Sequence, residues 1–375
     1  MRILMLNYEF PPIGGGGAPV SFELCRELVR RGHVVDVVTM HARGTKRFEV
    51  VDGINIFRVL SLRRKNEICY PYEMATYVAS AIPFCLQRMR KHKYDLIHAH
   101  FIFPTGVVGA VLKWRTKVPL VVTAHGSDIP LYNPDRFRFL HRLLHPMWRK
   151  VVRSIDTLIA PSEYLKHHIQ TFANIPVTVI PNGFRMELIA PSIRERKILI
   201  VSRIFRRKGV QYFLEAIKDM DLDWEIIVAG DGPYLPQLKK QAENIKPRVN
   251  FTGFVQNDQL HYLYETSSIF IFTSQNESFG VVLLEAMSAG LAIITTNVSA
   301  LPEVVENTAL LVEPNNPQQI REAVLKLINN KTLREELGNK GRERAKLFNW
   351  PTITARYEAA YRVTPGVTDG SSSNI

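Results

Sequence analysis

Two glutamates flank an apolar segment in the second half of the chain. Glu285 is the only charged residue in the segment 278–302, and a helix beginning just after Gly280 would be apolar on nearly every side and therefore buried. A buried carboxylate is costly unless it accepts hydrogen bonds, so Glu285 is expected to bind something specific. Glu277 lies in the loop before that helix, whose first amides, at Phe279 and Gly280, favour an anion. The pattern favours a site for an anionic ligand over a salt bridge within the domain.

A basic loop is the second candidate for chemistry. The segment 202–209 follows a predicted strand and contains Arg203, Arg206, Arg207 and Lys208. Arg203 and Lys208 stand at opposite ends of a strand-to-helix loop, so both side chains can reach one anion. A guanidinium offers a fixed fork of donors and an ammonium a mobile charge, a combination suited to pyrophosphate. The side chains of Arg206 and Arg207 are expected to face solvent.

Four consecutive glycines at 14–17 lie between the first predicted strand and the next helix. They let a ligand approach the backbone and present amides near a helix N-terminus, which suits a phosphate or a sugar. A flexible turn is the alternative. A dinucleotide site is disfavoured because the spacing is not a clean G-x-G-x-x-G. In addition Asp36, the nearest acid at the right distance, lies inside the second strand rather than at its end.

A histidine follows another strand at the same edge of the predicted sheet. His125 comes directly after the strand at 120–124, and Asp128 follows three residues later. His125 could donate to a sugar hydroxyl or to developing charge, with Asp128 orienting it or capping the next turn. Because His125 is expected to face the glycine loop, we weigh a functional role equally with a purely structural one.

Two further groups have spacings that occur in metal sites. His98 and His100 are separated by one residue on a strand, but no further ligands follow at recognisable spacing, so they are interpreted as structural. Asp219, Asp221 and Asp223 have the D-x-D spacing but lie away from the glycine-rich loops, in what is more simply a solvated connector. No essential metal and no cofactor are expected.

The elements that position these residues alternate between strand and helix in two series. Short strands that are apolar on both faces and separated by helices indicate parallel sheets. The chain is therefore expected to be an α/β protein of two Rossmann-like domains, with parallel sheets facing across a cleft and a ligand at the carboxyl ends of the strands. The predicted domains are 1–181 and 182–349, with a helix at about 350–363 packing back on the first and a disordered tail at 364–375. The predicted strands lie at 2–6, 34–39, 96–98, 120–123, 157–159, 177–180, 198–202, 225–229, 250–252, 269–273 and 292–295.

Composition and charge exclude several classes of protein. With 375 residues and 46% hydrophobic residues, the chain can form more than one core. Its three cysteines have no metal spacing and do not suggest a disulfide framework, which indicates a reducing compartment. No signal peptide is expected, because the N-terminus has only a short apolar run and no small-residue cleavage site. No spanning helix is expected either, because the longest nearly apolar stretch, 101–112, is about half the ~20 residues that a membrane-spanning helix needs. A cytoplasmic location follows as an expectation.

The positive charge is concentrated in the first half. Residues 1–180 contain 25 Lys and Arg against 13 Asp and Glu, whereas residues 181–375 contain 23 against 22. The segment 136–153, from Arg136 to Arg153, has six cationic residues, no acid and an apolar stripe at helical spacing that includes Trp148 and Val151. Such a helix can lie at an anionic membrane surface, here the inner face of the cell membrane, although the stripe could equally be core. Nucleic acid is not expected as a partner, because it would leave the buried Glu285 unexplained.

Taken together, these motifs resemble the retaining GT-B glycosyltransferases, specifically glycosyltransferase family 4, also described as glycosyl transferases group 1. The resemblance covers nearly the whole chain. It is strongest over the segments Pro181-Asn-Gly183, 202–209, Gly230-Asp-Gly-Pro233, Gly253-Phe-Val255 and 277–285.

The resemblance implies a nucleotide diphospho-sugar donor, UDP- or GDP-linked, held mainly by the second domain, and a glycan or lipid-linked acceptor on the side of the first. Glu285 resembles the residue that binds the ribose hydroxyls, and Arg203 and Lys208 resemble the pyrophosphate clamp. The implied donor site also includes the amides around Phe279, Gly280 and Val281, the backbone at Val255 beside the base, and Gly15 and Gly16 at the phosphate and acceptor side. Glu277 and His125 match positions that contact the transferred sugar.

The function expected on this basis is retaining, metal-independent sugar transfer in cell-surface glycan synthesis. The alternatives are a GT-B sugar-nucleotide epimerase or hydrolase, which would share the donor site, and an NAD-dependent oxidoreductase, which the poor dinucleotide pattern disfavours. The sequence does not distinguish the base, the sugar, the acceptor or the oligomeric state.

Overall fold

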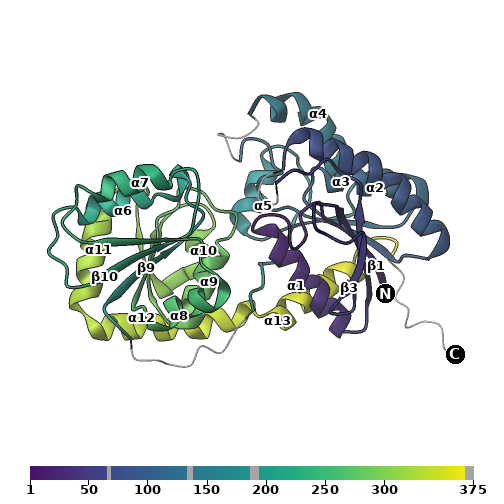
Figure 1. Cartoon of the computed structure of the whole chain (residues 1–375). Helices are drawn as coiled ribbons and strands as arrows, with labels where there is room; N and C mark the ends of the chain where they lie inside the picture. Colours follow the sequence, from purple (N-terminus) through teal and green to yellow (C-terminus); the bar gives the residue numbers. More distant parts are fainter. Residues whose placement is uncertain (66–68, 133–137, 186–193, 368–375) are drawn as a thin grey trace. The chain divides into compact units, whose positions relative to one another are not determined.

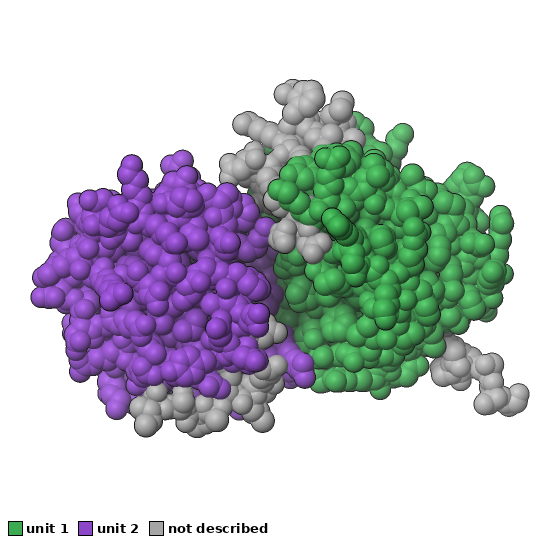
Figure 2. All heavy atoms as spheres, viewed as in Figure 1, with its two compact units in different colours: residues 1–183, 350–375 green, residues 184–349 purple. Residues whose placement is uncertain are grey.

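The computed structural model describes residues 1–65, 69–132, 138–185 and 194–367. The chain divides into two compact units, residues 1–183 with 350–375 (unit 1) and residues 184–349 (unit 2) (Figures 1 and 2). The division falls two residues after the boundary expected from the sequence, at the Pro181-Asn-Gly183 segment. The segment from Trp350 onward belongs to unit 1.

Unit 1 is built on a sheet in which β1 is central. The strand order is β3-β4-β2-β1-β5-β6-β7-β8, and every described pairing is parallel except that of β3 with β4. Strand order reverses beside β1, which has β2 on one side and β5 on the other; a ligand is accommodated at such a point, beyond the carboxyl ends of the strands. The elements are β1 (Arg2–Leu6), α1 (Gly17–Arg30), β2 (Val34–Met40), β3 (Phe48–Val51), β4 (Ile54–Val59), α2 (Pro71–Lys91), β5 (Leu96–His100), α3 (Thr105–Thr116), β6 (Leu120–Thr123), α4 (Arg138–Ser154), β7 (Thr157–Ala160), α5 (Glu163–Gln170), β8 (Thr178–Val179) and α13 (Trp350–Arg362).

Unit 2 contains a second parallel sheet, of order β11-β10-β9-β12-β13-β14, in which strand order reverses between β9 and β12. The carboxyl ends of these two strands are therefore where unit 2 can hold a ligand. The elements are β9 (Lys197–Val201), the 3-10 turn η1 (Arg206–Lys208), α6 (Val210–Ile217), β10 (Glu225–Ala229), α7 (Leu235–Ala242), β11 (Val249–Gly253), α8 (Asn257–Thr266), β12 (Ile269–Phe272), α9 (Val281–Ala289), β13 (Ala292–Thr296), α10 (Leu301–Val305), η2 (Glu306–Thr308), β14 (Ala309–Val312), α11 (Pro317–Asn329), α12 (Lys331–Ala345) and η3 (Lys346–Phe348).

Both faces of the unit 2 sheet are covered, which explains why its strands read as continuous apolar runs. On β9, Ile198 and Ile200 pack in one core with α6, α7 and α11, while Leu199 packs in a second core with α8, α9 and α10. This alternation is the two-residue period of a strand. Figure 1 shows the same layering, with the sheet between two groups of helices.

The structure corrects two sequence predictions. The strands β3, β4 and β14 were not predicted, and β3 pairs antiparallel with β4. The tail was expected to be disordered from residue 364, but Thr364 is buried, and its hydroxyl lies 2.8 Å from the Ala360 carbonyl, to which it donates. The tail residues 368–375 lie outside the described residues.

Candidate active site

The glycine loop at 14–17 connects β1 to α1. Gly14 has φ of +116°, and a Cβ there would come within 2.5 Å of the Cβ of Glu9, so the position requires glycine. The Gly15 amide donates to Oε2 of Glu9 at 3.0 Å, a partner that the sequence did not suggest. A Cβ on Gly17 would lie 2.8 Å from Cζ of Phe101 and 3.6 Å from Nδ1 of His125. The structure thus brings the loop and His125 together.

His125 follows β6 and is held by its backbone and its ring. Asp128 accepts hydrogen bonds from the amides of His125, at 3.1 Å, and of Ile102, at 2.6 Å, so it fixes the loop rather than the imidazole. The ring packs against Phe101 with centroids 4.5 Å apart. Burial lowers the pKa of His125 to about 4 and raises the pKa of Asp128 to about 6. His125 is therefore neutral near pH 7 and can donate or accept one hydrogen bond without gaining charge.

The two histidines of β5 have separate partners. Nδ1 of His98 lies 2.8 Å from the Tyr361 hydroxyl and its Nε2 lies 2.9 Å from Oγ1 of Thr123, a fully paired arrangement. His100, by contrast, has its Nδ1 2.9 Å from Nε2 of His125. The contact between a histidine interpreted as structural and the candidate catalytic histidine was not anticipated.

In unit 2 the basic loop is anchored to the end of β12. Gly209, after η1, has φ of +73°, and a Cβ there would lie 2.0 Å from the carbonyl oxygen of Thr273. The Lys208 ammonium forms an ion pair with Glu277, and their side chains are 13% and 14% exposed. Arg203 is exposed on the same loop, with its guanidinium 5.1 Å from the centre of the Phe205 ring. Two residues singled out separately in the sequence, Lys208 and Glu277, are thus in contact.

The Glu277 carboxylate and backbone are both fixed. The Ser274 hydroxyl donates to Oε1 of Glu277 at 2.7 Å, and the Glu277 amide donates to Oγ of Ser299 at 3.0 Å. These two serines were missed in the sequence: Ser274 lies in the same loop as Glu277 but is part of no pattern, and Ser299 lies in the loop after β13. Lys208 and Ser274 both contact Oε1 of Glu277, and among the described residues none is found donating to Oε2.

Helix α9 begins beside Glu277. Gly280, at its N-terminal end, has φ of +91°, and Val281 is the first helical residue. The Phe279 side chain is buried and its ring lies 5.8 Å from that of Phe348, so only its backbone can meet a ligand. The amides at this end carry the partial positive charge of the helix and suit a phosphate.

Glu285 lies in the second turn of α9. The Tyr264 hydroxyl, from α8, donates to its Oε2 at 2.8 Å. Burial raises the pKa of Glu285, and the hydrogen bond from Tyr264 opposes that shift. The helix is buried as expected, whereas the Glu285 side chain remains partly exposed, so that its carboxylate can still receive hydroxyl donors.

Val255 is half-buried in the loop between β11 and α8. This loop adjoins those after β9 and β10: the Gly230 amide donates to the Gly253 carbonyl at 2.8 Å, and a Cβ on Gly230 would lie 1.9 Å from the Ser202 carbonyl oxygen. The carboxyl edge of the unit 2 sheet therefore gathers the loops that carry most of the predicted donor-site residues.

Two alternative sites lose support. Asp36 is fully buried in β2 and its carboxylate accepts from Tyr94, Asn55, Arg88 and Arg2, so it is occupied within the sheet rather than presented to a ribose. Asp221 and Asp223 are 90% and 92% exposed and pair with Lys246 and Arg196. In the described residues, no group of three or more His, Cys, Asp or Glu side chains is arranged to hold a metal ion.

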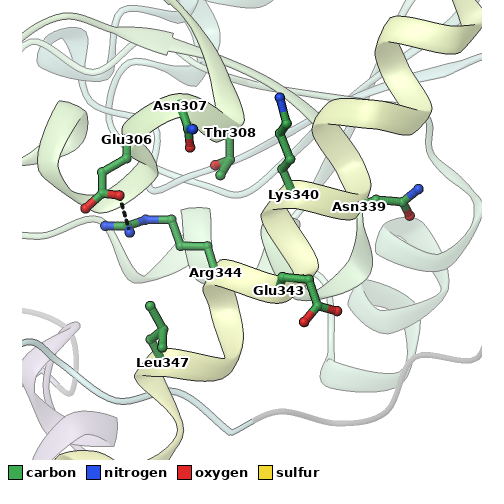
Figure 3. A pocket seen from close by; sticks show the side chains of 8 residues that line it. All are labelled: Glu306, Asn307, Thr308, Asn339, Lys340, Glu343, Arg344 and Leu347. Carbon is green, nitrogen blue, oxygen red and sulfur yellow. Dashed lines mark ion pairs between the residues drawn. The ribbon is translucent and has the colours of Figure 1, made fainter.

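A separate surface pocket of about 430 Å³ lies between η2 and α12 (Figure 3). Arg344 and Glu306 form an ion pair of 2.7 Å at its edge. None of the predicted site residues lines this pocket, so it does not represent the donor site.

The basic segment 136–153 coincides largely with α4. Arg136 and Phe137 of this segment lie outside the described residues. Trp148 and Val151 of its apolar stripe are buried, and the indole Nε1 of Trp148 donates to the Asp128 carbonyl at 3.1 Å, so this part of the stripe is core. Arg149, Lys150 and Arg153 are exposed. Among the helices of the described part of the chain, none has the length and apolar character needed to cross a bilayer.

Comparison with known proteins shows which families the two halves of the chain match. Residues 14–188 match the sequence model of the family described as Glycosyltransferase Family 4, and residues 190–344 match that of Glycosyl transferases group 1. An uncharacterized glycosyltransferase of Methanocaldococcus jannaschii is 32% identical over 360 residues, covering 93% of this chain and 95% of that protein.

Two solved structures share the fold. Sucrose-phosphate synthase from Thermosynechococcus elongatus has a TM-score of 0.81 at 21% identity, covering 96% of this chain and 98% of the other. Anabaena HepE, solved with UDP-glucose, has a TM-score of 0.77 at 20% identity, covering 96% and 99%. The expected GT-B fold class is confirmed.

Proposed function

Because the chain belongs to the family 4 and group 1 glycosyltransferases, we propose that it transfers a sugar from a UDP- or GDP-linked donor to a glycan or lipid-linked acceptor in cell-surface glycan synthesis. One observation carries the proposal: Lys208 and Glu277 meet at the carboxyl ends of β9 and β12, beside the first turn of α9. This is the point of strand-order reversal where the fold accommodates a ligand. The UDP-glucose complex of the HepE structure is consistent with such a donor.

The chemistry that we propose is transfer with retention at the front face of the sugar. The bond between the anomeric carbon and the diphosphate oxygen breaks, and negative charge develops on the leaving diphosphate. Arg203, Lys208 and the N-terminal amides of α9 stabilise that charge. The leaving phosphate oxygen takes the proton of the acceptor hydroxyl, whose oxygen forms the new bond to the anomeric carbon.

The remaining residues bind and orient the donor. Glu285 accepts hydrogen bonds from the ribose hydroxyls, and the backbone at Val255 meets the base. Glu277 orients the sugar through its second carboxylate oxygen, and His125 donates to a sugar hydroxyl. Two cations and a helix terminus supply the positive charge, so we propose that an added metal is not required.

The test compares two arginines at the two ends of β9. Thermal shifts with UDP, GDP, ADP and NAD, with and without EDTA, are measured on wild type, Arg203→Ala and the control Arg196→Ala. Arg196 is 70% exposed and precedes the amino end of the strand. A ligand that binds only the folded state raises the melting temperature. A shift with one nucleoside diphosphate, insensitive to EDTA, lost in Arg203→Ala and kept in Arg196→Ala supports the proposal.

A shift with NAD alone, or one equal in both arginine variants, contradicts it. Retention is tested by NMR of the product, in which the anomeric configuration of the donor must be conserved. Hydrolysis or epimerisation of the donor without any acceptor would favour the alternative activity.

We further propose that unit 1 contacts an anionic membrane surface from the cytoplasmic side. Support comes from the exposed Arg149, Lys150 and Arg153 on α4 and from Trp114 on α3, which is 65% exposed with the Arg115 guanidinium 4.6 Å from its ring. All three cysteines of the chain are free and buried, which fits a reducing compartment.

Flotation with vesicles tests the membrane contact. A variant with Gln at 149, 150 and 153 is compared with a control carrying Gln at Lys239, Lys240 and Lys331, which are exposed in unit 2. Binding to vesicles containing phosphatidylglycerol at low salt should be lost only in the first variant. Absence of binding by the wild type at low salt contradicts the proposal.

A further inference from the structure

His100 contacts the candidate catalytic histidine at one specific atom. Its Nδ1 lies 2.9 Å from Nε2 of His125, and the two rings are stacked with centroids 5.2 Å apart. His100 is completely buried at the end of β5. Nε2 of His125 is therefore occupied within unit 1, and its other nitrogen, Nδ1, is the atom directed toward Gly17 and the glycine loop.

The two neutral rings share one proton across this contact, in one of two arrangements. Either His100 donates from Nδ1 and His125 accepts at Nε2, or His125 donates from Nε2 and His100 accepts at Nδ1. A neutral imidazole carries a single N–H, so the choice fixes where the second proton of the pair resides. Burial keeps both rings neutral, since it lowers the pKa of His125 to about 4 and that of His100 well below its usual value.

The second ring nitrogen of His100, Nε2, decides between the two arrangements. Its Nε2 is buried and has no hydrogen-bond partner among the described residues. If His100 accepted at Nδ1, its proton would sit on this Nε2 as a buried donor without an acceptor, which proteins rarely tolerate. If His100 donates from Nδ1, only a lone pair is left there, which costs less.

We infer that His100 is a positioning residue that fixes His125 in the tautomer protonated at Nδ1, so that His125 presents a hydrogen-bond donor to the ligand beside the glycine loop. The tautomer follows from the contacts within unit 1. Its role in sugar transfer rests on the proposed function.

The same contacts argue against a proton relay. The ring of His98 stacks on that of His100 with centroids 4.6 Å apart, but the two ring nitrogens of His98 are hydrogen-bonded to Tyr361 and Thr123. A chain of hydrogen bonds from His125 therefore ends at His100 in the described structure. This geometry suits a fixed donor to a sugar oxygen rather than a base that must pass its proton onward.

NMR measures the tautomer directly and without substrate. In protein labelled with ¹⁵N-histidine, the two imidazole nitrogens of His125 are assigned by comparison with His125→Asn. We expect the spectrum of a neutral ring protonated at Nδ1. A ring protonated at Nε2 in the wild type would overturn the inference, whatever the activity of the protein.

Two substitutions at one position separate positioning from packing. His100→Asn keeps an N–H at the δ position, and His100→Leu fills the space without a donor. We expect the Nδ1–H tautomer to persist in the Asn variant and to be lost or mixed in the Leu variant. If His100→Leu does not fold, the wild type and the Asn variant still decide the question.

Activity provides the second readout. We expect kcat to fall about tenfold or more in His100→Leu and to recover to within about threefold of the wild type in His100→Asn, with a smaller change in KM for the donor. Equal loss in both variants with an unchanged tautomer would overturn the positioning role. A wild type that shows the expected tautomer but no sugar transfer would refute the proposed function and leave the tautomer assignment standing.

Discussion

The Lys208 ammonium and the Glu277 carboxylate form an ion pair in which both side chains are largely buried, at 13% and 14% exposure. The Ser274 hydroxyl donates to the same carboxylate oxygen. A diphosphate bound by Lys208 must therefore share this cation with Glu277. Glu277, which we propose to orient the sugar, therefore also lowers the affinity of Lys208 for a free diphosphate.

The first prediction is that Glu277→Gln affects binding and turnover in opposite directions. Removing the negative charge leaves Lys208 fully available to a diphosphate, so the affinity for UDP or GDP should rise about fivefold to tenfold, on the order of 1 kcal/mol. Sugar transfer should fall at least tenfold, because the amide orients the sugar less well than the carboxylate. Calorimetry and an initial-rate assay measure the two effects.

The matched control is Glu336→Gln. Glu336 also pairs with a lysine, Lys340, but on the exposed surface of α12 in unit 2. The Glu336→Gln substitution should leave both the nucleotide affinity and the rate of sugar transfer unchanged. Weaker nucleotide binding in Glu277→Gln would contradict the competition between Glu277 and the diphosphate.

The second prediction concerns Tyr264→Phe, which removes the hydroxyl that donates to Glu285. Burial already raises the pKa of Glu285 and the hydrogen bond from Tyr264 opposes this, so its loss raises the pKa further. The carboxylate form is then lost at higher pH. Since the ribose hydroxyls donate to the carboxylate, nucleotide binding should weaken more at pH 6 than at pH 8, by about threefold to tenfold at pH 6.

Calorimetry with UDP and GDP at the two pH values checks this. Tyr262→Phe is the control, because Tyr262 lies on the same helix and is 54% exposed. The same loss of affinity at pH 6 and pH 8 in Tyr264→Phe would show that the hydroxyl does not act through the ionisation of Glu285.

The sequence predicted the buried strands of the fold better than the exposed ones. The strands β1, β6 and β10, which are buried throughout or at every residue after the first, have the predicted bounds, because both faces of a central parallel strand are apolar. β3 was missed because it is an edge strand whose side chains alternate between exposed and half-buried. The Asp52-Gly53 turn, with φ of +50° and +79°, was an available hairpin signal for β3 and β4.

Only some of the residues that the structure brings together at the candidate site were singled out in the sequence. Arg203, Lys208 and Glu277 lie in loops that follow strands, so their spacing from those strands was informative. Of the partners of Glu277, Ser274 lies three residues earlier in the same loop and Ser299 in another loop, whereas Tyr264, the partner of Glu285, comes from another helix. None of these three side chains shows a local pattern in the sequence. The contact of His100 with His125 likewise depends on the parallel pairing of β5 with β6, which places His100 beside Thr123, two residues before His125.

The third prediction uses three neighbouring glycines with different surroundings. Gly14→Ala forces a side chain into a left-handed conformation against Glu9 and should cost about 1–3 kcal/mol, seen as a lower melting temperature. Gly17→Ala places a methyl group 2.8 Å from Cζ of Phe101 and 3.6 Å from Nδ1 of His125, so Phe101 must move. Activity should fall more than tenfold in that variant, with a moderate loss of stability.

Gly16→Ala distinguishes ligand approach from folding. At Gly16 φ is −61° and nothing lies within 4 Å of a Cβ, so the melting temperature should not change. A ligand that contacts the loop backbone would meet the methyl group, and KM for the donor or the acceptor should rise several-fold. An unchanged KM for both substrates would show that no ligand approaches Gly16.

The fourth prediction is a loss of stability as the pH falls from 7 to 5. Burial lowers the pKa of His98 to about 3, that of His125 to about 4, and that of His100 well below its usual value. Between their ordinary pKa near 6.5 and pH 5, the unfolded chain binds protons at these rings that the folded protein does not. The free energy of unfolding therefore decreases with decreasing pH.

Asp128 and Glu285 act in the opposite direction, because burial raises the pKa of each, that of Asp128 to about 6. The folded protein takes up protons there that the unfolded chain does not. Three histidines outweigh two acids, so the free energy of unfolding should be roughly 2–4 kcal/mol lower at pH 5 than at pH 7. Denaturant titrations at pH 7, 6 and 5 measure it.

His100→Asn isolates one of these protons. It keeps the hydrogen bond to His125 but does not titrate, so its free energy of unfolding should depend less steeply on pH than that of the wild type. His167→Gln, at a side chain 72% exposed on α5, is the control. A pH dependence in His100→Asn parallel to that of the wild type would mean that the buried ring at position 100 does not contribute, and that other groups cause the loss of stability at low pH.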